Sequence, residues 1–286
     1  MNVAAPWYQG TAPSHRAALG ALLAMAMLLA HTAVRAVEPK VVHVALSEAA
    51  PPTSFASNGH PAGMFPELLA ALFRHAPGYA AELHSLPWSR AQWAVEHGVM
   101  DMFITFPSAN RLLYANFSAR PLHVLDYGNI VYDRSGPKAA RIETATSFRD
   151  MRELVFVSQE TVAWELENVP AYIERYTVNG PASLMHMTFR RQAGDFFIMN
   201  AEQAVYYARQ LGYEKQLGMK RVSFIPHSLV ALHLGVRKDY PDQKALMRVM
   251  ASAMKHPEFL AKKAAIIQKY RLAFSAGELP LPDTLP

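Results

Sequence analysis

Short apolar runs alternate with helical patterns along this chain from about residue 40 onward. Residues 41–46 form a β-branched run that predicts a buried strand. After the prolines at 51 and 52, residues 66–73 carry apolar side chains one, four and five positions apart, which is typical of an amphipathic helix. Pro66 suits the first turn of that helix. Because this unit recurs along the chain, the pattern indicates an α/β fold.

Capping patterns predict where two of the later helices begin. Ser89 with Gln92 resembles a capping box and predicts a helix over residues 90–97, and Asn200 predicts a second helix over residues 201–211 in the same way. A turn-rich stretch between these helices indicates entry into a second lobe. Further strands are predicted at 154–158, 195–199 and 229–236, and further helices after Thr161 and at 243–254 and 257–270.

The loop after the predicted strand at 99–105 carries the most informative polar side chains. It places Ser108 and Arg111 at the carboxyl end of a buried strand, which is where open α/β sheets bind ligands. The guanidinium of an arginine can donate two parallel hydrogen bonds to one carboxylate. The pattern therefore suggests recognition of a small acid.

The first 36 residues have the layout of a secretory signal. Residues 1–16 contain no acidic side chain, and residues 17–30 are almost wholly Ala, Leu and Met. Small residues at Val34 and Ala36 predict cleavage after Ala36 and export to the periplasm. The alternative, an uncleaved anchor, is less favoured because the apolar run is shorter than the ~20 residues that span a bilayer. No stable membrane insertion is expected after cleavage.

Composition and motif searches exclude several classes of function. The chain has no cysteine, so it has neither disulfides nor thiol chemistry. Its formal charge of +5 falls to +3 once Arg16 and Arg35 are removed with the signal, and no basic stripe with interleaved aromatics indicates nucleic-acid binding. No HExxH, Gly-rich phosphate loop or GxSxG motif occurs. His186 lies between two methionines, but adjacent residues cannot all point one way, so no metal site and no cofactor are predicted.

Several short motifs, in order, resemble those of extracellular solute-binding proteins of family 3, the periplasmic receptors of polar amino-acid importers. The resemblance covers roughly residues 41–271. The motifs that carry it are Glu48-Ala49-Ala50-Pro51-Pro52 with Phe55, Gly63 with Glu67-Leu68, Pro87-Trp88-Ser89-Arg90, Gly98-Val99-Met100-Asp101, Arg111 with Phe117-Ser118 and Pro121, Ala193-Gly194-Asp195, Lys238-Asp239-Tyr240-Pro241 and Gln268-Lys269-Tyr270.

This resemblance implies a two-lobed periplasmic-binding-protein fold of type II, with a mixed sheet and flanking helices in each lobe. The first lobe is expected to comprise residues 41–128 and 235–286, and the second residues 129–234. Two crossing strands near 129–132 and 229–234 would form the hinge. Ligand would bind in the cleft, and the lobes would close over it.

The resemblance also implies ligand contacts in the first lobe. Arg111 would hold the ligand's carboxylate, and Ser108 stands where the family usually has a threonine that meets the same group. Phe106 stands where the family usually has another hydroxyl residue. The Thr105 hydroxyl would replace it as a ligand contact. The alternative is that the Thr105 hydroxyl bonds only to the backbone at the end of its strand. A surface arginine paired with a neighbouring acid is the alternative for Arg111.

Three further side chains of the first lobe are candidate contacts. Trp88 and Phe55 could form aromatic walls over an apolar or cationic part of the ligand. Core packing is the alternative for both. Glu48 resembles an acid often found before the double proline, and it would meet a ligand cation or fix the loop.

The second lobe departs from the family's pattern. Asn200 stands where amino-acid binders usually have an aspartate for the ammonium group, although it could equally be a helix cap. Thr161 stands at the amino end of a helix where backbone N–H groups would attract a carboxylate, but Glu160 would repel one. These departures predict that the ligand is not a plain α-amino acid.

The sequence therefore predicts a monomeric binding protein, not an enzyme, that captures a small polar, carboxylate-bearing solute. It would deliver this solute to an inner-membrane ABC permease. A sensory role, in which the lobes report ligand to a membrane receptor, is one alternative. A second is an enzyme, since the family's fold also hosts a periplasmic dehydratase. That alternative requires a general acid such as Glu160 or Glu165 with its pKa raised toward neutrality.

Overall fold

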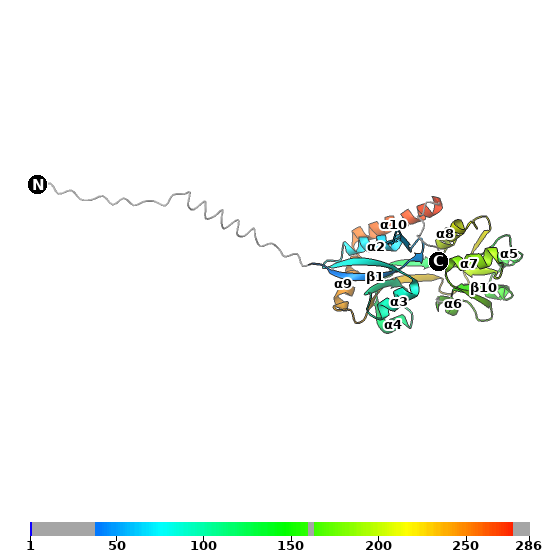
Figure 1. Cartoon of the computed structure of the whole chain (residues 1–286), viewed down its shortest axis with the longest axis horizontal. Helices are drawn as coiled ribbons and strands as arrows, with labels where there is room; N and C mark the ends of the chain where they lie inside the picture. The colour runs from blue at the N-terminus through cyan, green and yellow to red at the C-terminus, as the bar shows by residue number, and fades with distance from the viewer. Residues whose placement is uncertain (2–37, 160–162, 277–286) are drawn as a thin grey trace. The chain divides into compact units, whose positions relative to one another are not determined.

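The computed structural model describes Met1 and residues 38–159 and 163–276, with side chains described as far as Tyr270. From Pro39 onward the chain forms one compact unit (Figure 1). Apart from Met1, the predicted signal at residues 1–36 lies outside the described residues, as do its cleavage after Ala36 and the residues Glu160 and Thr161. Within the described part, no helix is both long enough and apolar enough to span a membrane.

The first sheet has six strands. β1 lies between β5 and β6 and is parallel to both, whereas β14 runs antiparallel to β6, β7 and β8, so the sheet is mixed. Its strands are β1 (Lys40–Ser47), β5 (Tyr79–Leu86), β6 (Met102–Thr105), β7 (Ala115–Phe117), β8 (His123–Asp126) and β14 (Leu229–Arg237). Beside it, β2 (Ala49–Ala50), β3 (Ser54–Ser57) and β4 (His60–Ala62) form a small antiparallel sheet.

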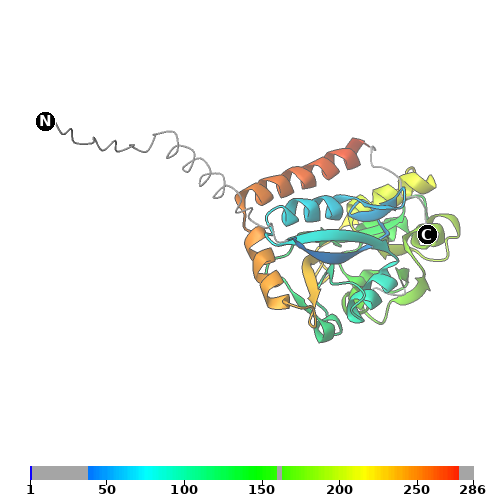
Figure 2. The same ribbon diagram turned by 60° about the vertical axis from the view of Figure 1, so that its left-hand side comes forward.

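Helices cover both faces of the first sheet because its strands alternate between two apolar sets. Val42, Val44 and Leu46 of β1 belong to the main core, whereas Ala45 packs in a second cluster with Ala91 of α3. α10 lies alongside α2, as Figure 2 shows in orange-red and cyan. The helices of this part are α2 (Met64–Phe73), α3 (Trp88–Glu96), the short α4 (Arg111–Tyr114), α9 (Gln243–Ala253) and α10 (Pro257–Ala276).

The second sheet has five strands in the order β11-β10-β12-β9-β13. β10 is parallel to β11 and β12, while β9 is antiparallel to β12 and β13. These strands are β9 (Asn129–Asp133), β10 (Val155–Gln159), β11 (Glu174–Val178), β12 (Phe196–Ile198) and β13 (Leu217–Arg221). Around them lie α5 (Ala139–Thr144), the 3-10 turn η1 (Phe148–Met151), α6 (Ala163–Asn168), α7 (Pro181–Met185), the π-helical η2 (His186–Arg190) and α8 (Ala201–Leu211).

Two neighbouring segments connect the sheets. Tyr127 and Gly128 join β8 to β9, and residues 222–228 join β13 to β14. The segments are hydrogen-bonded to each other, since the Tyr127 N–H donates to the Ser228 carbonyl at 2.7 Å and the Val222 N–H to the Gly128 carbonyl at 2.8 Å. The mixed two-sheet α/β fold predicted from the sequence is confirmed. The lobe boundaries and the hinge strands near 129–132 and 229–234 stay predictions. Each predicted hinge strand directly follows one of these two connecting segments in the sequence.

The two predicted helix caps have different outcomes. Asn200 caps α8 as expected, because its Oδ1 accepts the Gln203 backbone N–H at 2.9 Å. The capping box at Ser89 is wrong. α3 begins at Trp88, two residues before the predicted start, and no side-chain hydrogen bond caps it. The Gln92 side chain instead accepts hydrogen bonds from Arg111.

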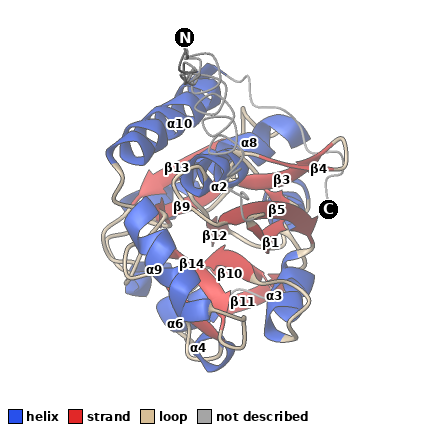
Figure 3. Cartoon of the chain, turned by 90° about the vertical axis from the view of Figure 1, so that its left-hand side faces the viewer, coloured by secondary structure: helices blue, strands red, loops and turns tan. Residues whose placement is uncertain are grey.

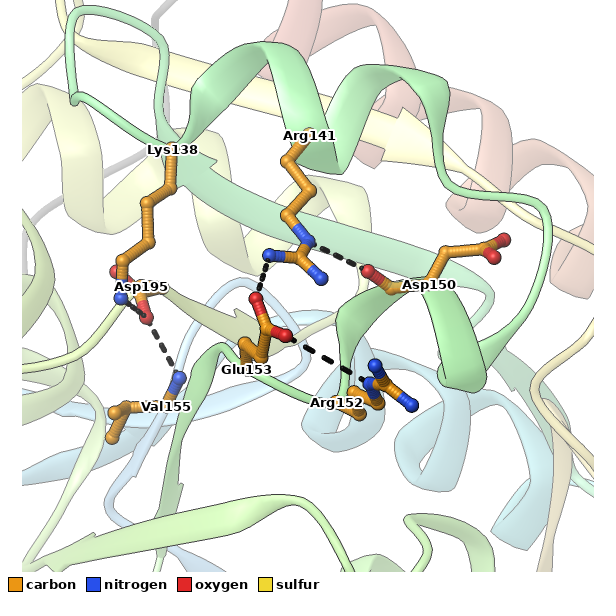
Figure 4. A network of polar contacts seen from close by, with 7 residues as sticks. All are labelled: Lys138, Arg141, Asp150, Arg152, Glu153, Val155 and Asp195. Atoms are coloured by element: carbon orange, nitrogen blue, oxygen red, sulfur yellow. Dashed lines mark hydrogen bonds and ion pairs between the residues drawn. The ribbon is translucent and has the colours of Figure 1, made fainter.

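A polar network fixes the start of β10 (Figure 4). One Asp195 carboxylate oxygen accepts both the Val155 backbone N–H at 2.7 Å and the Lys138 ammonium at 2.9 Å. Nearby, Arg141 donates to the Glu153 carboxylate at 2.5 Å and to the Asp150 carbonyl at 2.8 Å. The Asp195 side chain is only 17% exposed, whereas that of Glu153 is 61% exposed. The hydrogen bonds of Asp195 are therefore the more buried contacts of this network.

Replacing Asp195 by alanine is expected to lower the free energy of unfolding by about 1–3 kcal/mol, because the Val155 N–H loses its acceptor. Chemical denaturation measures this change. Glu153→Ala is the control, and it should leave stability nearly unchanged because that ion pair is solvent-exposed. If Asp195→Ala and Glu153→Ala lowered the free energy of unfolding equally, the buried Asp195 contacts would not be the stabilising part of the network.

Candidate ligand-binding site

Arg111 is held at the carboxyl end of β6. The strand ends at Thr105, the chain turns through residues 106–110, and Arg111 begins the single-turn helix α4. Although it follows a surface loop, Arg111 is only 6% exposed. A buried guanidinium is uncommon because charged groups lose solvation on burial. Its partners therefore decide what the site can bind.

The described partners of Arg111 are uncharged. Its Nε and Nη2 donate to the Gln92 side-chain oxygen at 3.1 and 2.8 Å, and its Nη1 donates to the Phe106 carbonyl at 3.1 Å. The guanidinium carbon lies 4.5 Å from the centre of the Phe106 ring and 5.6 Å from that of Trp88. The charge thus lies near two aromatic rings and is held by amide oxygens.

No carboxylate of the described residues lies within ion-pair distance of Arg111. Burial lowers the pKa of Arg111 below its usual value, while the nearby Tyr114 hydroxyl opposes this shift. The guanidinium remains charged. Three of its five N–H groups account for the hydrogen bonds above. A buried cation without a charged partner creates a favourable environment for an anion, and a carboxylate matches its planar donor geometry.

Ser108 and Thr105 precede Arg111 by three and six residues in the sequence. The Ser108 Oγ accepts the Arg111 backbone N–H at 3.4 Å, so this hydroxyl supports the start of α4 and can still donate its own proton. Thr105 is buried at the end of β6, opposite His233 of β14. Among the described residues its hydroxyl has no hydrogen-bond partner. Of these predicted contacts, Trp88 and Ser108 lie beside Arg111, whereas among the described residues no bond joins Thr105 to Arg111. Their role in ligand binding stays a prediction.

The remaining candidates of the first sheet differ from one another. Trp88 is half-buried, and its ring stacks on Phe103 at 6.3 Å while also facing Arg111. Phe55 is fully buried, which fits core packing rather than an aromatic wall. Glu48 is half-buried, and its backbone bonds to Leu86 and Ala56 fix the loop after β1.

A second group of polar side chains lies at the carboxyl ends of β10 and β12. Asn200 is only 3% exposed, and its amide bonds twice to Gln203. Glu165 of α6 is equally buried, and its carboxyl accepts the Gln159 backbone N–H at 3.0 Å. Burial raises the pKa of Glu165 to about 8, although the Gln159 N–H and the Arg175 charge oppose the shift. This carboxyl is therefore mostly protonated at neutral pH.

Tyr127 connects the members of this second group. Burial and the Glu165 charge raise the pKa of the Tyr127 hydroxyl to about 12, while a contact with the Asn200 side chain opposes the shift. The Tyr127 ring also lies 5.2 Å from that of Trp164, whose indole N–H donates to the His227 carbonyl at 3.1 Å. Tyr127 and His227 belong to the two connecting segments, so this group lies where the chain passes between the sheets.

Gln92 and Tyr127 were not predicted from the sequence. Gln92 was assigned to a helix cap, and its contact with Arg111 spans 19 positions that no local pattern relates. Tyr127 stands in a short connection without a motif. Among the described residues, no hydrogen bond or ion pair joins the Arg111 group to the Asn200 and Glu165 group. The structure therefore presents two polar groups, one at the end of each sheet.

Several solved structures share the fold of this chain. The amino acid ABC transporter substrate-binding protein AbpA from Streptococcus pneumoniae, bound to L-arginine, is similar with a TM-score of 0.64 and 16% identity, over 84% of this chain and 97% of that one. A histidine kinase sensor domain with similarity to periplasmic binding proteins has a TM-score of 0.67 and 19% identity, over 82% of this chain and 96% of that one.

The BvgS VFT2 domain of Bordetella pertussis is also similar, with a TM-score of 0.63 and 17% identity, over 91% of this chain and 99% of that domain. No protein-family model matches the chain, and no curated protein is significantly similar to it in sequence. At these identities the likeness concerns architecture alone. The chain has the fold that amino acid ABC transporter substrate-binding proteins share with sensor domains of the periplasmic-binding-protein type.

Proposed function

We propose that this protein captures a small polar solute through a carboxylate group that pairs with Arg111. The observation that carries the proposal is a buried guanidinium whose described hydrogen-bond partners are all uncharged. An incoming carboxylate would supply the missing negative charge beside the Trp88 and Phe106 rings. Trp88, Ser108 and Thr105 would then contact the same end of the ligand.

The other end of the ligand would meet Asn200 and Glu165. Neither supplies the permanent negative charge that an ammonium group prefers, because Asn200 is an amide and the raised pKa of Glu165 keeps its carboxyl mostly neutral at pH 7. Thr161, which lies outside the described residues, stays a predicted contact. The favoured ligands are therefore small acids with a hydroxyl, carbonyl or second acidic group, rather than plain α-amino acids.

Delivery to an inner-membrane ABC permease is the role we favour for the bound solute. The comparison proteins include a transporter component and a histidine kinase sensor domain, so sensing for a membrane receptor is the second candidate. Both roles require export to the periplasm, in agreement with the signal-like residues 1–36. A dehydratase-like activity would rest on Glu165 as general acid, and product formation from a bound acid would distinguish it.

A thermal-shift screen of the chain from residue 37 onward tests the proposal. A ligand that binds only the folded state at 100 times its Kd stabilises it by about 2.7 kcal/mol. That corresponds to a rise in Tm of about 5–10 °C for a chain of this size. The screen should contain organic acids, each beside its carboxamide, together with amino acids and amines. Shifts confined to acids support the proposal, and shifts confined to amines contradict it.

A further inference from the structure

Two histidines and a glutamate converge on the face of the first sheet that also carries α3. His43 lies on β1, while Glu82 and His84 lie on the neighbouring strand β5 (Figure 3). The parallel register pairs His43 with Glu82 and Ala45 with His84, so all three side chains point to one face. Ala45 is covered by α3, but the side chains of the three remain 29–56% exposed.

The spacing of their donor atoms matches that of ligands around a metal ion. The His43 Nδ1 lies 3.2 Å from the His84 Nε2, and 3.6 Å from one Glu82 oxygen. The other Glu82 oxygen lies 3.3 Å from the same His84 Nε2. A tetrahedral zinc ion with ligands at about 2.0–2.1 Å separates neighbouring donor atoms by about 3.3–3.4 Å. The two histidine nitrogens are therefore spaced as two ligands of such an ion, and one ligand atom from each of the three residues lies within 4.8 Å of the other two.

The charges around this cluster suit a cation. Glu82 has no lysine or arginine partner among the described residues. The nearby Asp101 and Arg237 neutralise each other through a 3.0 Å ion pair, and Asp101 also accepts the His43 backbone N–H. Two neutral imidazoles and one carboxylate are preferred ligands of zinc and other late divalent transition metals, whereas magnesium and calcium prefer oxygen.

A second cluster of the same composition lacks these properties. The rings of His75 and His256 stack face to face, with centres 4.0 Å apart, and the closest His75–Glu258 contact is 3.9 Å. Arg74 and Lys262 line the same surface pocket and would repel a cation. This cluster serves as an internal comparison.

We propose that His43, Glu82 and His84 form a binding site for a divalent transition-metal ion of the zinc class, with its fourth position open to solvent. The site is independent of the ligand site at Arg111, since His43 stands four residues before the end of β1, roughly 13 Å along the strand. A bound ion would link the edge strand β5 to its neighbour. The sequence predicted no metal site because only the strand register unites these residues.

Isothermal titration calorimetry of the chain from residue 37 onward with Zn²⁺ tests the site. The expected result is one Zn²⁺ bound with micromolar Kd, a rise in Tm with Zn²⁺ and none with Mg²⁺. Each of His43→Ala, Glu82→Gln and His84→Ala should weaken Zn²⁺ binding by at least about tenfold. Co²⁺ should give the visible bands of a four-coordinate ion in the wild type but not in these three variants.

The matched control is the double variant His75→Ala and His256→Ala, which should bind Zn²⁺ as the wild type does. Melting curves without metal establish that each variant is folded. Failure of the wild type to bind Zn²⁺ would overturn the proposal and reduce the cluster to a His–His–Glu hydrogen-bond network. Loss of binding in the double variant, or undiminished binding in the three single variants, would equally overturn it.

Discussion

Replacing Arg111 by methionine is expected to weaken binding of the preferred acid at least about a hundredfold, which equals about 2.7 kcal/mol. Each charge-assisted hydrogen bond contributes about 1.5–3 kcal/mol, and a carboxylate would form two with the guanidinium. Methionine keeps an unbranched apolar chain near the Trp88 and Phe106 rings, so the space occupied by the Arg111 side chain should remain filled. Titration calorimetry with the best ligand of the thermal-shift screen measures the loss.

Two further variants separate charge, geometry and folding. Arg111→Lys retains the charge but not the planar fork, so it should bind the acid more weakly than the wild type and more tightly than Arg111→Met. Arg90→Met is the control, because Arg90 is exposed on the same stretch and faces the Trp93 ring at 4.1 Å. Equal affinity in wild type and Arg111→Met would show that the carboxylate anchor lies elsewhere.

Replacing Glu165 by glutamine is expected to remove a large part of the pH dependence of stability. The folded protein keeps Glu165 protonated up to about pH 8, whereas in the unfolded chain its ordinary pKa is 4.5. This group therefore favours folding most below pH 4.5, and that contribution is lost as the pH rises toward 8. Between pH 5 and pH 8 the loss amounts to about 3 kcal/mol.

Glutamine cannot ionise, yet its side-chain oxygen can still accept the Gln159 backbone N–H. Relative to wild type, Glu165→Gln should thus gain stability steadily from pH 5 to pH 8 in urea denaturation. Glu167→Gln, an exposed glutamate on the same helix, should run parallel to wild type. Parallel curves for Glu165→Gln and wild type would mean that the carboxyl is already ionised at neutral pH.

Much of the fold could be predicted because its central elements have strong patterns. The β-branched run at 41–46 became β1, the apolar repeat at 66–73 fell within α2, and the run at 229–236 fell within β14. β5 was not predicted, since it has neither a continuous apolar run nor a regular alternation of polar and apolar residues, and none of its residues is fully buried at this sheet edge. The short strands β8 and β13 likewise lack a pattern that distinguishes them from loops.

The candidate site could be predicted only in part, for a related reason. Arg111 was recognised because a polar loop after a buried strand is a local signal. Gln92 and Tyr127 were not, because their importance depends on contacts between distant segments. The same applies to Glu165, which was proposed only as a possible acid and whose burial no spacing could show. The cluster at His43 is the clearest case, because it depends on strand register.

Whether Arg111 recognises the carboxylate is tested most directly by comparing one acid with its carboxamide on two proteins. Calorimetry would measure both compounds against the wild type and Arg111→Met, using the best acid from the screen. We expect the wild type to prefer the acid by at least about a hundredfold and Arg111→Met to abolish this preference. If Arg111→Met retained the wild-type preference for the acid, Arg111 would not be the group that recognises the carboxylate.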